Sequence, residues 1–261
     1  MTSKPDISPP STRDRILEVA ERLFAERGYN KVSLRSITAA AEANMAAVHY
    51  YFRTKEALLR AIFEARVAPI SEERKRLLRE VLERSGDARP PIRDVLAAFI
   101  GPGVRLARTP EGAVFNQLSA ICSVDPDPTV RAIVFSVHDE VAQEFVRALQ
   151  RACPELDPKV FFVRLQCVFG SMMYIRANNG RVNRLLPQDA PLPHDVDALL
   201  DMMLDFLAAG LAAPGSTRSA GTAAYTHPLT AAEQGTTDCT ASLPDAEAAR
   251  PRRRKARPRD A

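Results

Sequence analysis

The sequence predicts an all-α fold of about nine helices, in which an N-terminal three-helix unit with a helix-turn-helix precedes a larger helical domain. Apolar residues recur at the spacing of helix faces along most of the 261 residues. No segment alternates with period two for long enough to indicate strands. Several helix starts are marked by a capping residue followed by proline, namely Thr109-Pro110, Asp125-Pro126 and Asp157-Pro158.

The first helix is expected to begin at Ser11 or Thr12, after ten polar, proline-rich residues that we expect to be flexible. Its apolar residues recur at helical spacing and form one buried stripe: Ile16, Val19, Ala20, Leu23 and Phe24. Gly28 then stands where a left-handed residue commonly ends a helix.

The next two helices are short and are separated by a tight turn. Ser33 is expected to cap the second helix. The third helix runs over about 44–51 and has a narrow apolar edge of Val48 and Phe52, which we assign to the core. Small residues open this third helix, and aromatic residues with polar tips follow them. This composition is typical of a helix that docks into a DNA groove.

The remaining helices follow in order along the chain. Thr54 is expected to cap the fourth, which should bend or break at Pro69. The expected ranges of these helices are 54–84, 91–107, 110–121, 126–152, 157–178 and 194–212.

These elements divide the chain into four parts. The flexible N-terminus covers 1–10, and the helix-turn-helix unit covers 11–70, with its motif at about 33–52. A larger helical domain covers 71–212. The tail, 213–261, is rich in Ala, Gly, Ser, Thr and Pro and ends in a run of arginines. We expect it to be disordered, because it has too little apolar surface to offset the entropy of ordering.

The charge distribution indicates where nucleic acid could bind. The whole chain has a net charge of +4, with +3 on residues 1–68, +6 on 250–261 and −5 on the residues between. Basic ends fit contact with nucleic acid. For the N-terminal excess the alternative is a solvated surface, and for the basic end it is disorder without a role in DNA binding.

The sequence offers no pattern for metal, cofactor or catalytic chemistry. The four cysteines have neither metal-type spacing nor a paired arrangement, as is usual in a reducing cytosol: Cys122, Cys153, Cys167 and Cys239. We find no nucleophile with an adjacent base and no glycine-rich phosphate loop, so we expect no enzyme activity and no cofactor.

We expect a cytoplasmic protein that does not contact a membrane. No secretory signal opens the sequence. The most apolar stretch, 160–175, is interrupted by Arg164 and Gln166, and we expect it to be too short to span a bilayer.

Between Thr12 and Ile62 the chain carries a long, gap-free pattern of residues: Ile16-Leu17, Ala20, Leu23-Phe24, Gly28-Tyr29, Ser33-Leu34-Arg35-Ser36-Ile37, Ala46-Ala47-Val48-His49-Tyr50-Tyr51-Phe52 and Lys55-Glu56-Ala57-Leu58-Leu59. This pattern resembles the N-terminal domain of the TetR family of bacterial transcriptional regulators. The rest of the chain resembles the family in helix number and length. The resemblance implies a regulator, most often a repressor, that binds double-stranded DNA at a palindromic operator.

The resemblance also implies which residues face the bases. Arg35 would reach a base edge, where a bidentate contact to guanine discriminates by about 1–3 kcal/mol. The alternative for Arg35 is a contact to phosphate. The leading end of the recognition helix, Asn44, Met45, Ala46 and Ala47, would face the base edges, with the alanines against thymine methyl groups. The alternative for Met45 is simple exposure.

Phosphate contacts are implied for Ser33, His49, Tyr50, Tyr51 and Lys55. Lys55 stands at a helix N-terminus, where backbone amides already attract phosphate. The chain departs from the family pattern at Glu42, where the turn usually has glycine. Either the turn differs or Glu42 adopts a strained φ. His49 and Tyr51 also exchange the residue types that the family often shows.

A single recognition helix covers only a few base pairs, so adequate specificity needs two copies. The last two long helices are the expected homodimer interface, which in this family resembles a four-helix bundle. The final helix carries a wide apolar stripe: Val196, Leu199, Leu200, Met203, Leu204, Leu207 and Leu211. The alternative is that this helix belongs to the core of one subunit.

The family resemblance further implies that the central helices enclose an effector pocket, whose occupancy weakens DNA binding. The candidate pocket residues are Phe99, Arg105, Phe115, Asn116, Leu118, Phe135, His138, Phe169, Met172, Met173 and Arg176. For the apolar members the alternative is ordinary core.

Such a wall suits a hydrophobic effector such as a fatty acid, an acyl thioester or an aromatic drug. The segment 115–173 resembles members that respond to lipid-derived acids. The alternative function is a helix-turn-helix regulator switched by a protein partner or by oxidation of Cys122, Cys153 or Cys167.

Overall fold

The computed structural model describes residues 11–186 and 195–214, so the expectations for 1–10 and for the tail beyond Pro214 lie outside the described residues. Within these two ranges the regular structure is helical, with eleven α-helices, two short 3-10 helices and no strand. The predicted all-α fold is therefore confirmed, and the expected number of about nine helices is two too low.

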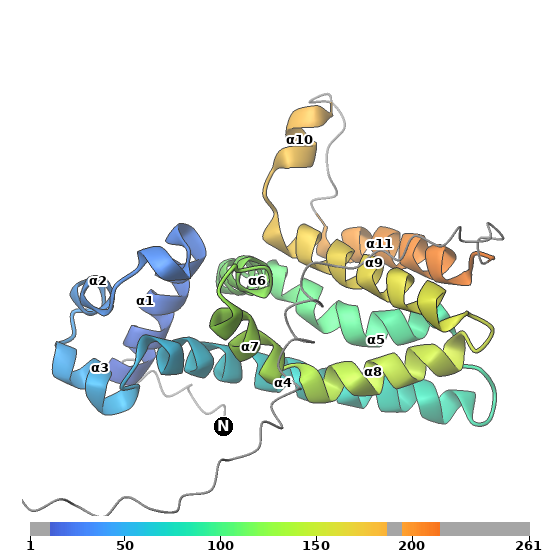
Figure 1. Ribbon diagram of the computed structural model, residues 1–261, viewed down its shortest axis with the longest axis horizontal. Helices are drawn as coiled ribbons and strands as arrows, with labels where there is room; N and C mark the ends of the chain where they lie inside the picture. Colours follow the sequence, from blue (N-terminus) through green and yellow to red (C-terminus); the bar gives the residue numbers. More distant parts are fainter. Residues whose placement is uncertain (1–10, 187–194, 215–261) are drawn as a thin grey trace, which may run out of the picture. The chain divides into compact units, whose positions relative to one another are not determined.

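The helices follow one another with short connections (Figure 1). Their bounds are α1 Thr12–Arg27, α2 Leu34–Ala40, α3 Met45–Tyr51, α4 Lys55–Ser85, α5 Ile92–Arg105, α6 Pro110–Ser123, α7 Pro128–Ser136, α8 Asp139–Ala152, α9 Pro158–Ala177, α10 Arg181–Leu185 and α11 Val196–Ala212. The 3-10 helices are η1 Tyr29–Lys31 and η2 Leu106–Arg108. The short helix α10 was not expected from the sequence.

Most of the predicted helix starts are confirmed by side-chain caps. The side chains of Ser11, Ser33, Thr54, Thr109 and Asp157 each accept a hydrogen bond from a backbone N–H of the first turn that follows. These bonds satisfy amides that have no partner inside the helix. Local sequence alone thus fixes where these five helices begin.

The expected single helix over 126–152 is wrong. Asp127, rather than Asp125, caps α7, and the chain leaves the helix again at Val137 and His138 before α8 begins. A residue that precedes proline is disfavoured in the helical region, so Asp127 before Pro128 blocks a helix that starts at Pro126. Asp125 instead accepts the Asp127 N–H through its Oδ1, at 2.9 Å, and closes a turn.

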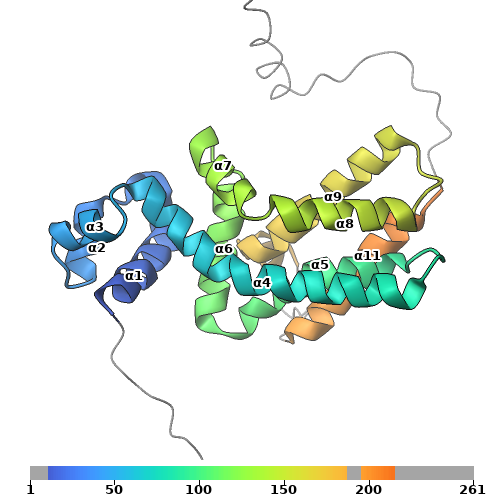
Figure 2. The ribbon, with the colours of Figure 1, turned by 90° about the horizontal axis from the view of Figure 1, so that it is seen from below.

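Helix α4 continues through Pro69 and connects the two parts of the fold. Pro69 is exposed, so its missing N–H faces solvent rather than the core. Figure 2 shows α4 leaving the three-helix unit and continuing beside α5 and α8. The alternative of a broken helix at Pro69 is therefore wrong.

The buried side chains form two clusters. The first cluster contains the core of the three-helix unit and also Phe115 and Leu118 of α6 and Val130 of α7. The rings of Phe63 and Phe115 lie 5.4 Å apart at their centroids. The second cluster joins the C-terminal half of α4 with α5, α8, α9 and α11. Helices α6 and α7 thus pack against the helix-turn-helix unit.

Helix α9 lies within the predicted range 157–178 and contains the apolar stretch 160–175. It has 20 residues and a window of mean hydropathy 1.2, so it is long and apolar enough to cross a membrane by length and composition. The prediction that this stretch is too short is therefore wrong. Only 22% of that window is buried in the subunit. One such helix is weak evidence for a membrane span.

Candidate nucleic-acid interface

Three helices hold the helix-turn-helix by a shared apolar core. Ile37 of α2 and Val48 of α3 are fully buried, and Phe52, just after α3, is buried beside them. They pack with Ile16 and Phe24 of α1 in the first cluster. Burial of Val48 and Phe52 confirms their assignment to the core. It also fixes the opposite side of α3 toward solvent.

The outward side of α3 carries its polar and aromatic residues. Tyr50 is 80% exposed, and its ring meets that of Tyr51 edge to face at 5.0 Å. His49 is exposed, and its Nδ1 lies 3.2 Å from the Arg53 carbonyl oxygen, which leaves Nε2 facing away. Ala46 is exposed as well. These residues form the exposed side of α3, opposite its buried edge.

Met45 and Ala47 are less accessible than expected, because both are only half-exposed. Ala47 packs against the apolar core of the unit. Of the two alanines proposed to face bases, Ala46 is therefore the one with an exposed side chain.

Two of the proposed contact residues already have structural roles as helix caps. Asn44 Oδ1 accepts a hydrogen bond from the Ala47 N–H at 2.7 Å and so caps α3. Ser33 Oγ accepts from the Ser36 N–H at 3.1 Å, and Ser36 Oγ accepts in return from the Ser33 N–H, which makes a capping box. Both side chains remain exposed.

Lys55 lies within its own domain rather than extending freely. Its Nζ stands 4.0 Å from the centroid of the Tyr29 ring, a cation–π arrangement, and partial burial lowers its pKa. Tyr29 in turn donates a hydrogen bond from its hydroxyl to Glu56 Oε1 at 3.0 Å. Sequence reasoning missed this packing because it depends on the approach of η1 to the start of α4.

The turn of the motif has Glu42 in the left-handed region, with φ of 48°. Of the two alternatives for this position, the strained φ is therefore confirmed. The left-handed conformation costs a residue with a Cβ about 1–2 kcal/mol. Because Glu42 is exposed, its side chain gains no buried contact that would offset this cost.

Replacing Glu42 by glycine is expected to raise the free energy of unfolding by about 0.5–1 kcal/mol, since relief of the strain exceeds the extra chain entropy of glycine. Urea denaturation measures this change. Glu42→Ala keeps the positive φ and should change stability by less than about 0.5 kcal/mol. Equal stabilisation by both variants would show that loss of the carboxylate, and not of strain, is the cause.

A shallow hollow joins α1 to the recognition helix. It has a volume of about 480 Å³ and is lined by Thr12, Arg15, Glu42, Ala43, Asn44, Ala46, Ala47, Tyr50 and Tyr51. Thr12 and Arg15 belong to this surface but were not predicted. Their sequence positions give no signal for it, because only the packing of α1 on α3 brings the start of α1 to this side.

Comparison with known proteins supports this arrangement in sequence and in fold. Residues 16–62 match the family model of bacterial regulatory proteins of the tetR family, and residues 97–210 match that of the tetracyclin repressor-like C-terminal domain. The chain belongs to the TetR family of bacterial transcriptional regulators. Its helix-turn-helix is thus a DNA-binding element of a transcription regulator.

Similar proteins agree with the family assignment. An uncharacterised HTH-type transcriptional regulator of Mycobacterium tuberculosis is 34% identical over 86 residues, which are 33% of this chain and 39% of that protein. Two solved structures, each 18% identical, share the fold. A putative fatty acid metabolism regulator of Clostridium perfringens has a TM-score of 0.55, and the match covers 77% of this chain and 100% of that protein. The fatty acid degradation regulator FadR of Bacillus halodurans has a TM-score of 0.52, with 82% and 100% covered.

In this TetR-family chain the predicted effector-pocket residues do not gather around one cavity. Phe115 and Leu118 are fully buried in the cluster of the helix-turn-helix unit, whereas Phe99 and Met172 belong to the second cluster. Phe135 is 47% exposed on α7. Arg105 is at the surface, where its Nε donates to Asp197 Oδ1 at 2.9 Å. Local sequence could not separate pocket wall from core because both are apolar and helical.

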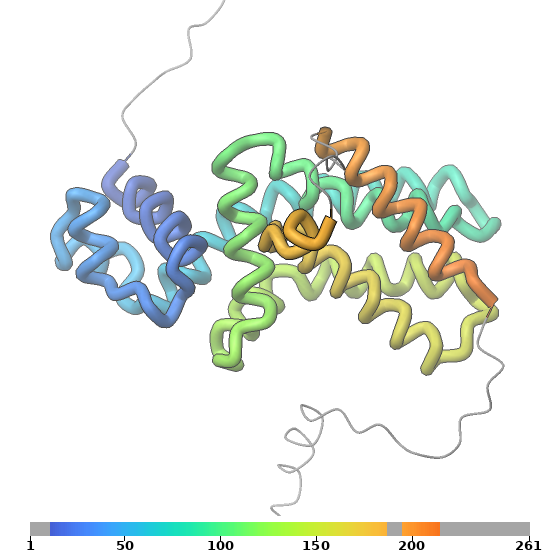
Figure 3. The backbone as a smooth tube through the Cα atoms, turned by 90° about the horizontal axis from the view of Figure 1, so that it is seen from above, coloured from blue at the N-terminus to red at the C-terminus, as the bar shows by residue number. Residues whose placement is uncertain are grey.

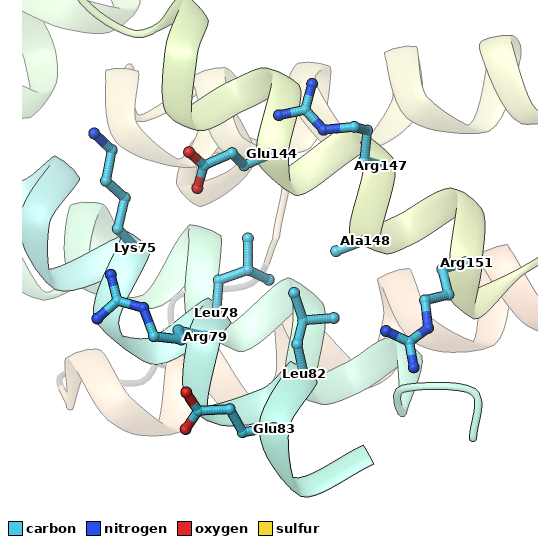
Figure 4. Close-up of a pocket in the computed structure, with 9 residues that line it drawn as sticks. All are labelled: Lys75, Leu78, Arg79, Leu82, Glu83, Glu144, Arg147, Ala148 and Arg151. Atoms are coloured by element: carbon cyan, nitrogen blue, oxygen red, sulfur yellow. The ribbon is translucent and has the colours of Figure 1, made fainter. Parts of the chain in front are cut away.

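A groove with a volume of about 610 Å³ lies elsewhere, between α4 and α8. Figure 4 shows its wall, which consists of Lys75, Leu78, Arg79, Leu82, Glu83, Glu144, Arg147, Ala148 and Arg151. None of the eleven predicted pocket residues lines it. Within residues 11–186 and 195–214 there is also no group of His, Cys, Asp and Glu that could hold a metal ion.

The predicted dimer residues of α11 mostly face inward. Leu200, Met203, Leu204, Leu207 and Leu211 are at most 6% exposed in the single subunit and pack in the second cluster, where α11 lies against α5 (Figure 3). These five residues are therefore core, as the alternative interpretation held. Val196 and Leu199 are half-buried. The sequence showed a wide stripe correctly but could not show which side of it packs within the subunit.

Proposed function

We propose that this TetR-family regulator is a repressor that binds a palindromic operator as a homodimer and is released by a small effector. The observation that supports DNA reading most directly is the exposed side of α3, held outward by the buried Val48 and Phe52. The proposal includes a cytoplasmic location, no cofactor and no enzyme activity.

Arg35 is the residue we propose for base reading. It is exposed on α2, and its side chain makes no ion pair with another described residue. A guanidinium that is not engaged within its own domain can place two N–H groups on O6 and N7 of guanine. Of the residues proposed for phosphate contact, Ser33 caps α2, His49, Tyr50 and Tyr51 lie on α3, and Lys55 begins α4.

Arg35→Ala is expected to weaken binding to the cognate operator by about 5- to 150-fold, which corresponds to the loss of one bidentate base contact. Binding to unrelated DNA should weaken much less. Fluorescence anisotropy with both DNAs at fixed salt measures the two effects. Arg35→Lys is the matched control, because it keeps the charge but loses the forked donor.

If Arg35 only contacts phosphate, Arg35→Lys will restore operator binding nearly fully. That result would remove Arg35 from base reading. The operator itself is first selected from a random-sequence library with the wild-type protein.

We propose that the dimer forms through the outward sides of α9 and α11. Exposed apolar residues gather there: Phe162, Val163 and Tyr174 of α9, and Met202 and Phe206 of α11. The two helices pack together in the subunit, and Arg164 of α9 donates to the Leu211 carbonyl oxygen at 2.8 Å. Contiguous exposed apolar surface is typical of a subunit contact. A second copy with the same surface would complete a four-helix bundle around a two-fold axis.

The coupling of effector to DNA would run through α6 and α7. Their buried residues belong to the same core as the helix-turn-helix unit, and Phe115 of α6 packs against Phe63 of α4. A shift of α6 on effector binding would therefore move that unit and change the spacing of the two recognition helices. The fatty-acid regulators named above show the fold alone, so they do not identify the effector.

The alternative switch, oxidation of a cysteine, has less support. Cys122 and Cys153 are buried, and burial raises the pKa of Cys122 to about 12 and also raises that of Cys153. A thiol with a raised pKa is a poor nucleophile toward peroxide. Cys167 is exposed, on α9. If peroxide releases the operator from the wild type but not from Cys167→Ser, the result would favour oxidation as the switch. If neither peroxide nor small-molecule effectors release the operator, the result would favour a protein partner.

A further inference from the structure

Two arginines are buried in the interior without an acidic partner. Arg74 of α4 is 3% exposed and Arg176 of α9 is 7% exposed. Neither forms an ion pair with any residue in the described ranges. The two buried acids lie elsewhere: Glu21 pairs with Arg66 at 2.8 Å, and Asp125 closes the turn before α7. An unpaired buried charge costs several kcal/mol, so two of them need a reason.

Each of the two guanidinium groups is held by a hydrogen bond to a neutral oxygen, which does not neutralise its charge. Arg74 Nε donates to the Phe99 carbonyl oxygen at 2.7 Å, and Arg176 Nε donates to Asn116 Oδ1 at 2.9 Å. Gly103 of α5 allows the approach of Arg74, because a Cβ there would lie 3.1 Å from its Nη2. Within the described residues, these Nε bonds are the side-chain hydrogen bonds that the two guanidinium groups donate.

Further polar groups near these arginines also lack partners. His138 Nδ1, Ser119 Oγ and Ser71 Oγ are buried and have no hydrogen bond within the described chain. Ser119 is one turn from Asn116 on α6, and Ser71 is one turn from Arg74 on α4. Burial, together with the charges of Arg74 and Arg176, lowers the pKa of His138 to about 3. The imidazole is therefore neutral and adds no third positive charge.

An apolar region adjoins this polar cluster. The Arg74 guanidinium lies 4.3 Å above the Phe99 ring, which stacks on Phe145 at 4.2 Å and meets Phe169 edge-on at 6.2 Å. Met172 precedes Arg176 by one turn of α9. A ligand at the cluster would thus meet positive charge at one end and aromatic surface at the other.

A cleft leads from the surface toward the same place. It has a volume of about 280 Å³ and lies between α4 and the α7–α8 junction. Its wall includes Ser71, one turn from Arg74, and Val137, which adjoins His138. The wall of the cleft contains none of Arg74, Arg176 and His138, so binding at the cluster would require this cleft to widen.

We propose that Arg74 and Arg176 form an interior oxyanion site that binds the acidic head group of the effector, with Asn116, Ser119 and His138 around it. The effector would then be a small organic acid with an apolar body rather than a neutral hydrophobic molecule. That the bound acid acts as the effector rests on the proposed function, whereas the presence of an anion site does not.

Thermal unfolding of the full chain tests the site with octanoate, octanamide, benzoate and inorganic phosphate at constant ionic strength. The expected result is a rise in Tm with octanoate or benzoate, of about 5–10 °C at a hundred times Kd, and none with octanamide. If phosphate raises the Tm as much as octanoate or benzoate does, the oxyanion site is supported, but the inference that the ligand has an apolar body is overturned. No shift with any of the three anions overturns the site.

Variants separate the interior site from the groove of Figure 4. Arg176→Met and Arg74→Met should lose the shift, yet each should fold with an unchanged or higher Tm because it removes an uncompensated charge. Arg79→Met, on the same helix as Arg74 but exposed in that groove, should keep the shift. Loss of the shift in Arg79→Met and not in Arg176→Met would place the anion in the groove and overturn the proposal.

Three further outcomes decide the remaining points. If Arg176→Met and Arg74→Met both unfold, the two arginines are needed for the fold. In that case the site is supported only if Arg176→Lys, which keeps the positive charge, retains the rise in Tm with octanoate. If octanoate raises the Tm but does not release operator DNA, the anion site is supported but its regulatory role is overturned. A shift in a protein that binds no DNA would contradict the proposed function alone.

Discussion

Gly112→Ala is expected to destabilise the protein by about 3 kcal/mol, the largest effect of any single methyl group that we foresee. A Cβ on Gly112 would lie 1.9 Å from the Leu106 carbonyl oxygen and 2.7 Å from its carbonyl carbon. These are backbone atoms of η2, so no side chain can rotate away. The first turn of α6 and η2 would have to move apart, and the buried contacts of α6 would loosen. Urea denaturation followed by circular dichroism measures the loss.

The neighbouring Ala113 provides the matched control. It is exposed on the same turn of α6, so Ala113→Gly should cost only about 1 kcal/mol, the difference in helix propensity. Gly112→Ala improves helix propensity and yet should be the more harmful change. A Gly112→Ala variant as stable as the wild type would contradict the close approach of η2 to α6.

Phe206→Asp is expected to abolish dimerisation and to weaken operator binding by about 100-fold or more, because a single recognition unit contacts only one half-site. Phe206 is 73% exposed on α11, so the substitution should leave the fold of the subunit intact. Across a two-fold axis the new carboxylate would be buried twice in an apolar contact. Analytical ultracentrifugation gives the mass, and anisotropy gives the affinity.

Phe135→Asp is the matched control for the dimer prediction. Phe135 is also an exposed phenylalanine, at 47%, but it lies on α7, away from the α9 and α11 surface. This variant should remain dimeric and bind the operator as the wild type does. If Phe206→Asp stays dimeric and Phe135→Asp does not, the subunit contact involves α7 and our assignment fails.

The parts of the fold that could be predicted are those that depend on neighbours in sequence. Ser11, Ser33, Thr54, Thr109 and Asp157 cap helices as expected, because an oxygen two or three residues before an unpaired amide acts locally. Where two such signals compete, at Asp125 and Asp127, local reasoning chose the wrong one.

The candidate sites divide in the same way. The exposed side of α3 follows from one short helix and its buried edge, so the sequence was sufficient to find it. The stripe of α11 was visible, but its contact with α5 was not, so Leu204 and Leu207 were placed at the wrong surface. Asn116 and Arg176, which the sequence suggested as polar anchors of an effector pocket, are buried, whereas Arg105 of the same group is exposed. Arg74 is also buried and was overlooked, because it lies on a helix rich in exposed charges.

By itself the sequence determined an all-helical TetR-family chain with a DNA-binding helix-turn-helix, since helix periodicity, caps and the motif are properties of residues close together along the chain. Only the tertiary structure decided which apolar side of α11 is interior and that α6 packs on the recognition unit. It also brought Arg74 and Arg176 into one interior without an acid. Burial and electrostatic pairing depend on residues about a hundred positions apart, which no local pattern encodes.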